Sequence, residues 1–301
     1  MIRRAAPLAA ALVVAGCTAA DETPASVAAP VAVPVVQPVR APAPAPVVSG
    51  PATFVFDGQL TQGGWIRGQA PGGTRSATLD GQPLVLDGQG RFFAAFDRDA
   101  GPSATLSANL ADGRTITSPL TIAAREWRIE RVNVARAPGG ATEAFMARRR
   151  PELARIEAAR ARDNGSDGWR QSFIWPVEGR ISGRFGSQRI YRGEPAAYHS
   201  GLDIAPGAGV AYVAPADGVV VLAADSPFSL EGNLLIIDHG MGLNSAFLHS
   251  QSLAVREGQA VRQGQLLGYV GATGRATGPH LHWSIKWRNA RLDPLLFLPP
   301  R

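Results

Sequence analysis

Glycine is the feature that most restricts the folds open to this chain. The 301 residues contain 34 glycines and 24 prolines, whereas charged residues make up 18%. From Trp169 onward, glycines separate short apolar runs such as 219–222, 233–238 and 265–270. Short apolar runs bounded by turns are typical of β-strands, since helices need longer periodic stretches. The sequence therefore predicts a mainly β protein.

Residues 51–123 have the same character but carry no cluster of chemically active side chains. Short strand-like segments alternate there with turns such as Asp80-Gly81 and Asp112-Gly113. Turn signals about every ten residues favour a small antiparallel sandwich of immunoglobulin-like type. We expect this region to be a spacer or a recognition module.

Residues 124–168 form the expected link to a second β domain at 169–301. The segment 151–162 predicts a helix, with Pro151 at its first position and Leu153, Ile156 and Ala159 as an apolar stripe. Arginine blocks at 148–150 and 160–162 indicate either a solvated face or contact with an acidic polymer. The link could also pack across a functional groove.

The first 50 residues predict export and tethering. Residues 1–17 have a positive start at Arg3 and Arg4, a short apolar core, and small residues before Cys17. This pattern resembles a bacterial lipoprotein signal, which implies lipidation of Cys17; the alternative is an ordinary signal peptide cut after Ala20. Residues 18–50 are rich in proline and alanine and predict an extended tether. Thr18 favours the outer over the inner membrane, with the protein facing the periplasm.

Charge and cysteine content narrow the classes of partner. The formal net charge is +6, and Lys286 is the only lysine. A basic surface suits anionic partners, but we find no zinc-finger spacing or other nucleic-acid motif, so nucleic acid is not expected. A single cysteine excludes an internal disulfide and a thiolate metal cluster.

Histidines supply the candidate chemistry. Alternate side chains of a strand share a face, so His280 and His282 should point the same way. Alone, such a pair is also compatible with two surface imidazoles on an edge strand. His199 and Asp203, four residues apart, add an imidazole and a carboxylate that suit Zn²⁺. Three protein ligands with one open position are typical of a catalytic zinc site.

Seven sequence blocks, in order, resemble the peptidase M23 family, the lysostaphin- or LytM-type peptidoglycan endopeptidases. They are His199-Ser-Gly-Leu-Asp203, Val213-Ala-Pro-Ala-Asp-Gly218-Val, Ile237-Asp-His-Gly240, Phe247-Leu-His249, Gly264-Gln-Leu-Leu-Gly268, Gly271-Ala-Thr-Gly274 and Gly278-Pro-His-Leu-His282. The resemblance covers about 175–295 and implies a LytM-type antiparallel, barrel-like β-sheet domain with one Zn²⁺ per chain.

The resemblance also implies roles for individual residues. His199, Asp203 and His282 match the metal ligands, and His249 and His280 match the two catalytic histidines outside the metal shell. Which of the two is the general base stays open. His239 is expected to make a structural hydrogen bond.

Two residues depart from the family pattern, which often has tyrosine at 247 and leucine at 250. Here Phe247 and Ser250 stand at these positions, and we expect them to affect rate or substrate preference more than activity. Tyr191 and Tyr198 are candidates to supply a hydroxyl to the groove.

The sequence thus predicts a zinc endopeptidase that cuts peptide crosslinks of peptidoglycan, for wall remodelling or division. One alternative is a non-catalytic relative that activates another wall hydrolase; another is a wall-binding module with a structural zinc. Expected partners are peptidoglycan, a membrane through the lipid anchor, and cell-division or wall-synthesis proteins. A monomer is the default, and the crosslink type stays open.

Overall fold

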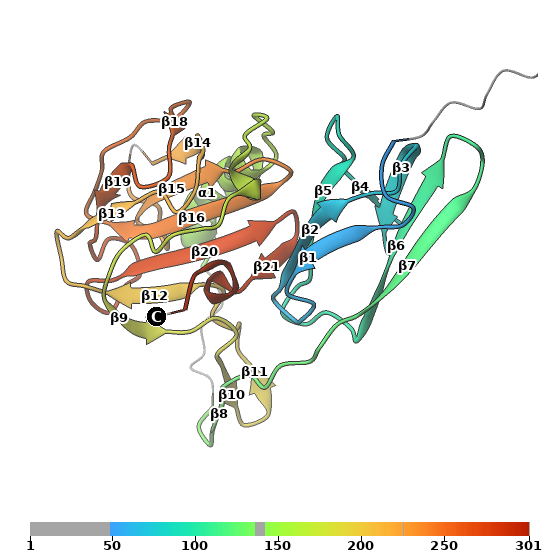
Figure 1. Cartoon of the computed structure of the whole chain (residues 1–301). Coiled ribbons are helices and arrows are strands. Elements are labelled where there is room, and N and C mark those ends of the chain that lie inside the picture. The colour runs from blue at the N-terminus through green and yellow to red at the C-terminus, as the bar shows by residue number, and fades with distance from the viewer. Residues whose placement is uncertain (1–48, 136–141, 225, 301) are drawn as a thin grey trace, which may run out of the picture. The chain divides into compact units, whose positions relative to one another are not determined.

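The computed structural model describes residues 49–135, 142–224 and 226–300 (Figure 1). The expected export signal with Cys17, and the expected tether as far as residue 48, lie outside these described residues. Strands predominate throughout the described part, as the glycine pattern predicts. None of the helices in that part is both long enough and apolar enough to cross a membrane.

The first β region contains two antiparallel sheets. One sheet has the strand order β1-β2-β5 and the other the order β4-β3-β6-β7. The strands are β1 (Val55–Gly58), β2 (Trp65–Gln69), β3 (Thr74–Leu79), β4 (Gln82–Leu84), β5 (Arg91–Ala95), β6 (Ser103–Leu110) and β7 (Thr115–Thr121). The immunoglobulin-like type stays a prediction.

Local sequence explains these strands and their turns. Every second side chain of β6 is buried, including Leu106, so one face of the strand supports the core. Asp80 and Gly81 both have positive φ, at 48° and 76°. A two-residue turn of this kind matches the twist of a hairpin, and it joins β3 to β4.

The link contains strand β8 (Ile129–Val132), helix α1 (Glu143–Arg160) and the short 3₁₀ helix η1 (Gly168–Arg170). The helix begins eight residues before the expected start at Pro151, so that prediction is wrong about the N-terminus. The reason is a better cap upstream: Thr142 Oγ1 accepts a hydrogen bond from the amide of Phe145 at 3.1 Å. Pro151 lies inside the helix on its exposed side.

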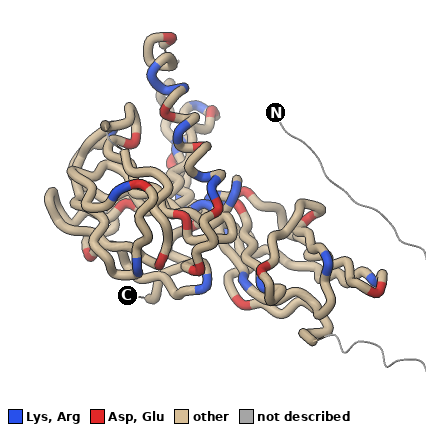
Figure 2. The backbone as a smooth tube through the Cα atoms, turned by 90° about the horizontal axis from the view of Figure 1, so that it is seen from above, with Lys and Arg blue, Asp and Glu red and all other residues tan. Residues whose placement is uncertain are grey.

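Helix α1 is attached by ion pairs and by part of the expected apolar stripe, since Ile156 and Ala159 pack in a hydrophobic cluster with residues of the second β region. Leu153 is 43% exposed, whereas Ala159 is buried. Arg149 is buried, and its two terminal nitrogens each lie 2.6 Å from an oxygen of Glu231. Basic and acidic residues alternate along the helix (Figure 2), and Arg150 pairs with Glu143. The arginine block 148–150 is therefore partly neutralised within the chain.

The second β region is dominated by an eight-stranded sheet in the order β18-β14-β15-β16-β20-β12-β9, with β21 paired to β20. In Figure 1, β20 lies between β16 and β12. The elements are β9 (Arg180–Gly183), β10 (Gln188–Tyr191), β11 (Glu194–Pro195), β12 (Leu202–Ala205), β13 (Ala211–Val213), β14 (Gly218–Ala223), β15 (Asn233–Asp238), β16 (Leu243–Ser250), β17 (Ser252–Leu253), β18 (Ala260–Val261), β19 (Leu266–Tyr269), β20 (Leu281–Trp287), β21 (Ala290–Leu292) and the 3₁₀ helix η2 (Pro294–Phe297).

The two β regions share one hydrophobic core. Phe297 of η2 packs against Trp65, with ring centroids 5.1 Å apart, and Phe93 lies 6.3 Å from Trp287. The indole N–H of Trp65 donates to the carbonyl of Leu296 at 3.1 Å. All described residues belong to one compact unit, 47–301. The expected domain boundaries at 123 and 168 stay a prediction.

Candidate metal centre

Strand register brings Asp203 and His282 together. Strands β12 and β20 are antiparallel, and Asp203 stands directly opposite His282. Directly opposed side chains point to the same face, within contact distance. On the other face of β20, Leu281 and Trp283 are fully buried in the core. The core side of β20 therefore fixes the orientation of His282 on its outer side.

His199 completes a group of three candidate ligands. It lies in the segment just before β12, and its Nε2 is 3.0 Å from Asp203 Oδ1 and 3.1 Å from His282 Nδ1. His282 Nδ1 is 2.8 Å from the same carboxylate oxygen. The three donor atoms lie within 4.8 Å of one another and could hold a metal ion. Two imidazoles and one carboxylate are a donor set that fits Zn²⁺.

Backbone and core groups orient these ligands. The Nδ1–H of His199 donates to the carbonyl of Arg184 at 3.0 Å, which leaves Nε2 facing the other donors. Beneath β20, the indole N–H of Trp283 donates to Ser245 Oγ at 3.2 Å. Ser245 Oγ lies 2.8 Å from His239 Nε2, and the Nδ1–H of His239 donates to the carbonyl of Asp217. His239 is thus a buried structural residue outside the metal group.

Two glycines leave room for the ligands. A Cβ added to Gly201 would lie 2.6 Å from His282 Nε2 and 2.7 Å from the carbonyl oxygen of Trp283. A Cβ added to Gly183 would lie 2.3 Å from Asp203 Oδ2. All three distances are shorter than any normal contact, so larger residues at these positions would displace the ligands.

Burial and charge act in opposite directions on the candidate ligands. Burial raises the pKa of Asp203, but hydrogen bonds from His199 and His282 outweigh it and hold that pKa well below its usual value. Burial lowers the pKa of His199, but the hydrogen bond and charge of Asp203 leave it above the usual value. Burial dominates at His282 and lowers its pKa. The carboxylate is therefore ionised at neutral pH.

His249 and His280 form a second pair beside the ligands. Their ring centroids are 4.9 Å apart, and His280 Nε2 is 3.8 Å from Asp203 Oδ1. The Nδ1–H of His249 donates to the carbonyl of Thr273, and that of His280 to the carbonyl of Gly278, both at 2.8 Å. Each imidazole therefore keeps an unprotonated Nε2 when neutral. Burial lowers the pKa of His249, which favours this neutral form.

The position of His249 depends on contacts that the sequence does not reveal. His249 has a φ of 66°, a left-handed conformation that is uncommon for a residue other than glycine. Its amide donates to the carbonyl of Glu231 at 2.8 Å, and Glu231 is the residue that Arg149 of α1 binds. The Thr273 hydroxyl donates to the carbonyl of Ser250 and accepts from the amide of Asn233, both at 2.9 Å. Thr273 belongs to a block already noted in the sequence; the Arg149–Glu231 pair joins residues 82 apart and has no sequence signal.

The two departures from the family pattern lie in the core. Phe247 is fully buried and stacks on Tyr212, with ring centroids 5.5 Å apart. Ser250 is also fully buried, and its Oγ lies 2.8 Å from the hydroxyl of Tyr212. Neither residue contacts the candidate ligands.

An open groove with a volume of about 650 Å³ adjoins His199. Tyr191 and Tyr198 both line it, as do Arg128 and Glu130 from the β8 region of the link. Strand β8 pairs in parallel with β10, so this part of the link forms one wall of the groove. The hydroxyl of Tyr198 accepts a hydrogen bond from Arg291 at 3.3 Å.

Comparisons with known proteins find relatives of the region that contains these residues. Residues 197–294 match the model of peptidase family M23. The chain is 36% identical over 127 residues to the peptidoglycan DD-endopeptidase ShyA of Vibrio cholerae, a match that covers 41% of this chain and 29% of that protein. It is also 36% identical over 127 residues to the murein hydrolase activator NlpD of Escherichia coli, covering 42% of this chain and 31% of that protein. The chain thus spans less than a third of either relative.

One solved structure resembles a much larger part of the chain. It is a Pseudomonas aeruginosa protein assigned to the M23 peptidases, 29% identical, with a TM-score of 0.61; the match covers 79% of this chain and 95% of that one. This share exceeds the region 197–294, so the likeness includes residues outside the family model. Through residues 197–294, with their grouped histidines and aspartate, the chain carries a domain of peptidase family M23.

Proposed function

We propose that the chain is a zinc-dependent endopeptidase that hydrolyses peptide crosslinks of peptidoglycan. The observation that carries this proposal is the complete set of five side chains. His199, Asp203 and His282 converge as donors, and His249 and His280 lie beside them with Nε2 free. The endopeptidase named among the relatives supports the same reaction.

His199 would hold Zn²⁺ through Nε2, His282 through Nδ1, and Asp203 through Oδ1, because these atoms face one another. Bound there, the ion would supply Lewis-acid activation of the scissile carbonyl and of the attacking water. The ionised Asp203 supplies one negative charge to the donor set. Among the described residues, three protein donors converge. A three-donor site leaves room for substrate, as in catalytic zinc sites.

The two remaining histidines would move the protons. One Nε2, of His249 or His280, takes a proton from the water as its oxygen bonds to the carbonyl carbon. The other stabilises the oxyanion or delivers a proton to the leaving amine as the C–N bond breaks. The carbonyls of Thr273 and Gly278 hold the two rings in the required tautomer.

The alternative is a non-catalytic activator of another wall hydrolase, because the activator NlpD is as similar in sequence as the endopeptidase. Digestion of purified wall, with and without added Zn²⁺, separates the two functions. An endopeptidase opens crosslinks alone and stops when a chelator removes the metal. A chain that opens none alone, but accelerates a second purified hydrolase, would be an activator.

We also propose a place in the bacterial cell envelope, with the chain anchored in the outer membrane through lipids on Cys17 and facing the periplasm. The residues around Cys17 support this placement, and two lipid signals would be needed for a stable anchor. Replacing Cys17→Ser should move the chain from the membrane fraction to the soluble periplasmic fraction. Membrane retention of this variant would contradict the anchor.

A further inference from the structure

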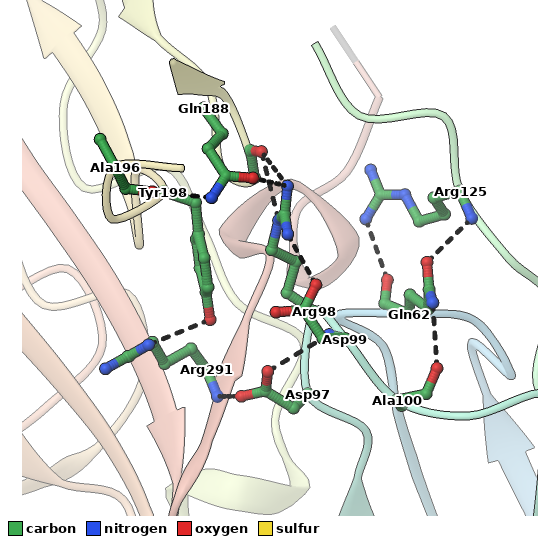
Figure 3. A network of polar contacts seen from close by, with 11 residues as sticks. Gln62, Asp97, Arg98, Asp99, Ala100, Arg125, Gln188, Ala196, Tyr198 and Arg291 are labelled. Carbon is green, nitrogen blue, oxygen red and sulfur yellow. Dashed lines mark hydrogen bonds and ion pairs between the residues drawn. The ribbon is translucent and has the colours of Figure 1, made fainter. Parts of the chain in front are cut away.

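A buried arginine of the first β region reaches the segment that carries His199. Arg98 follows β5 and is 6% exposed. Its Nε and Nη2 donate to the carbonyl of Gly186 at 3.3 and 3.0 Å, and Nη2 also donates to Gln188 Oε1 at 3.2 Å (Figure 3). Its third nitrogen, Nη1, bonds Asp99 at 2.6 Å. Every nitrogen of this guanidinium therefore has a partner, two of them across the junction between the regions.

The groups that Arg98 binds are joined directly to His199. The amide of Gly186 donates to the carbonyl of His199, and the amide of His199 donates to that of Ser187, both at 2.8 Å. Gln188 closes the same segment from the other side, because its Nε2 donates to the carbonyl of Ala196 at 2.7 Å. Two residues before Gly186, the carbonyl of Arg184 fixes the His199 ring. The guanidinium of Arg98 thus holds, through hydrogen bonds, the backbone segment that positions the candidate ligand His199.

Aromatic rings enclose the same guanidinium. Arg98 Cζ lies 4.6 Å from the ring centroid of Tyr198, the neighbour of His199, and 5.2 Å from that of Trp127 in the link. Arg291 lies on Tyr198 as well, at 5.4 Å, and its amide donates to Asp97 at 2.8 Å (Figure 3). Such stacking restricts an arginine to one geometry, which a lysine cannot reproduce.

We propose that Arg98 is a positioning residue for the metal centre, so that the first β region preorganises the ligand His199. This inference rests on the proposed zinc function. Without Arg98, the carbonyl of Gly186 and the side-chain oxygen Oε1 of Gln188 lose their shared donor, and the segment 184–199 gains freedom. Metal binding then has to order that segment, which weakens zinc affinity. The first β region is more than a spacer on this account.

The matched control is Arg67, which also crosses the junction between the regions. Its Nη1 donates to the carbonyls of Arg170 and Gln171, at 2.6 and 3.1 Å, and none of its described contacts involves the His199 segment. Zinc dissociation constants of the wild type, Arg98→Ala and Arg67→Ala should be measured by competition with a chromophoric chelator. We expect Arg98→Ala to weaken zinc binding about tenfold, as loss of ligand-orienting groups does. Arg67→Ala should keep the wild-type constant although it loses thermal stability.

Amide hydrogen exchange of the metal-free proteins supplies a second measurement. Arg98→Ala should speed exchange at Gly186 and His199, whose amides bond within this segment, and Arg67→Ala should not. If Arg98→Ala does not fold, Gln188→Met removes both the acceptor of Arg98 Nη2 and the donor to the carbonyl of Ala196, and it should raise the zinc dissociation constant. Equal constants and equal exchange rates in all variants would overturn the positioning role. A wild-type chain that binds no zinc would instead overturn the proposed function, while exchange still tests the Arg98 contact.

Discussion

His280 and His282 are two residues apart, yet the structure positions their imidazoles in different ways. His282 lies on strand β20 opposite Asp203 and turns Nδ1 toward that carboxylate. His280 precedes the strand, donates its Nδ1–H to the carbonyl of Gly278, and leaves Nε2 facing the site. Sheet register thus pairs His282 with Asp203 in the proposed ligand half, whereas loop carbonyls orient both rings, of His249 and His280, in the proposed proton-transfer half. Substitutions in the two halves should separate metal binding from turnover.

Replacing the two neighbouring histidines should have the largest and most different effects. His282→Ala should lose bound zinc and all activity, because it removes one of three donors. His280→Ala should keep zinc and lower kcat about 10²- to 10⁴-fold, the usual contribution of a proton-transfer group. Zinc content after dialysis measures metal binding by each variant, and kcat on purified wall measures its turnover. Loss of zinc from His280→Ala would mean that His280 is a ligand.

A glycine-to-alanine substitution should weaken zinc binding in the ligand half of the site but not in the proton-transfer half. Gly201→Ala places a Cβ 2.6 Å from His282 Nε2 and should weaken zinc binding strongly. Gly278→Ala adds a Cβ with no heavy atom within 4 Å and keeps the carbonyl that binds His280. This second variant should bind zinc as the wild type does. Equal zinc affinities of the two variants would contradict the packing described for the ligand half.

Protonation of the buried His239, which lies beneath the ligand half, should destabilise the folded protein at acid pH. Burial lowers the pKa of His239 from about 6.5 to about 4. The unfolded chain therefore binds a proton that the folded chain does not, between pH 6.5 and 4. The resulting stability is complete above pH 6.5 and is lost as the pH falls, by about 3 kcal/mol in all. The free energy of unfolding in urea should be measured across this pH range for the wild type and His239→Gln, and it should depend less on pH in the variant. If the two proteins show the same pH dependence, His239 is not the group responsible.

Substitution of Thr273 should have the smallest effect of the four, and it should alter turnover without altering zinc binding. Thr273→Val keeps the carbonyl that binds His249 but removes the hydroxyl that joins Ser250 and Asn233. We expect a loss of about 1–3 kcal/mol in stability and a lower kcat with unchanged zinc content. Thr277→Val, an exposed threonine in the same segment, is the control. A fall in zinc content in Thr273→Val would show that the two halves are not separable.

Sequence reasoning is most successful where the signal is local. The apolar runs separated by glycine predict the strands, and the alternation of side chains places His282 and Trp283 on opposite faces. The spacing of His199 and Asp203 across Gly201 indicates one site because β12 directly follows that turn. All three candidate ligands are brought together.

Sequence reasoning misses one local contact, the cap of helix α1, and several contacts between distant residues. Thr142 starts helix α1 earlier than Pro151 predicts, because a cap depends on the local backbone and not on apolar periodicity. Arg149 looks like part of a solvated basic block, but it is buried against Glu231. Arg98 has no neighbour in sequence that indicates Gly186 as its partner. Pairing of this kind follows from the folded arrangement alone.

The most direct test is mass spectrometry of purified peptidoglycan treated with zinc-loaded wild type and zinc-loaded His280→Ala. The account predicts that the wild type converts crosslinked muropeptides into uncrosslinked ones, with one water added for each bond cut, and identifies the bond. The variant should leave the crosslinks intact despite its zinc. A zinc-loaded wild type that also leaves every crosslink intact would contradict the account.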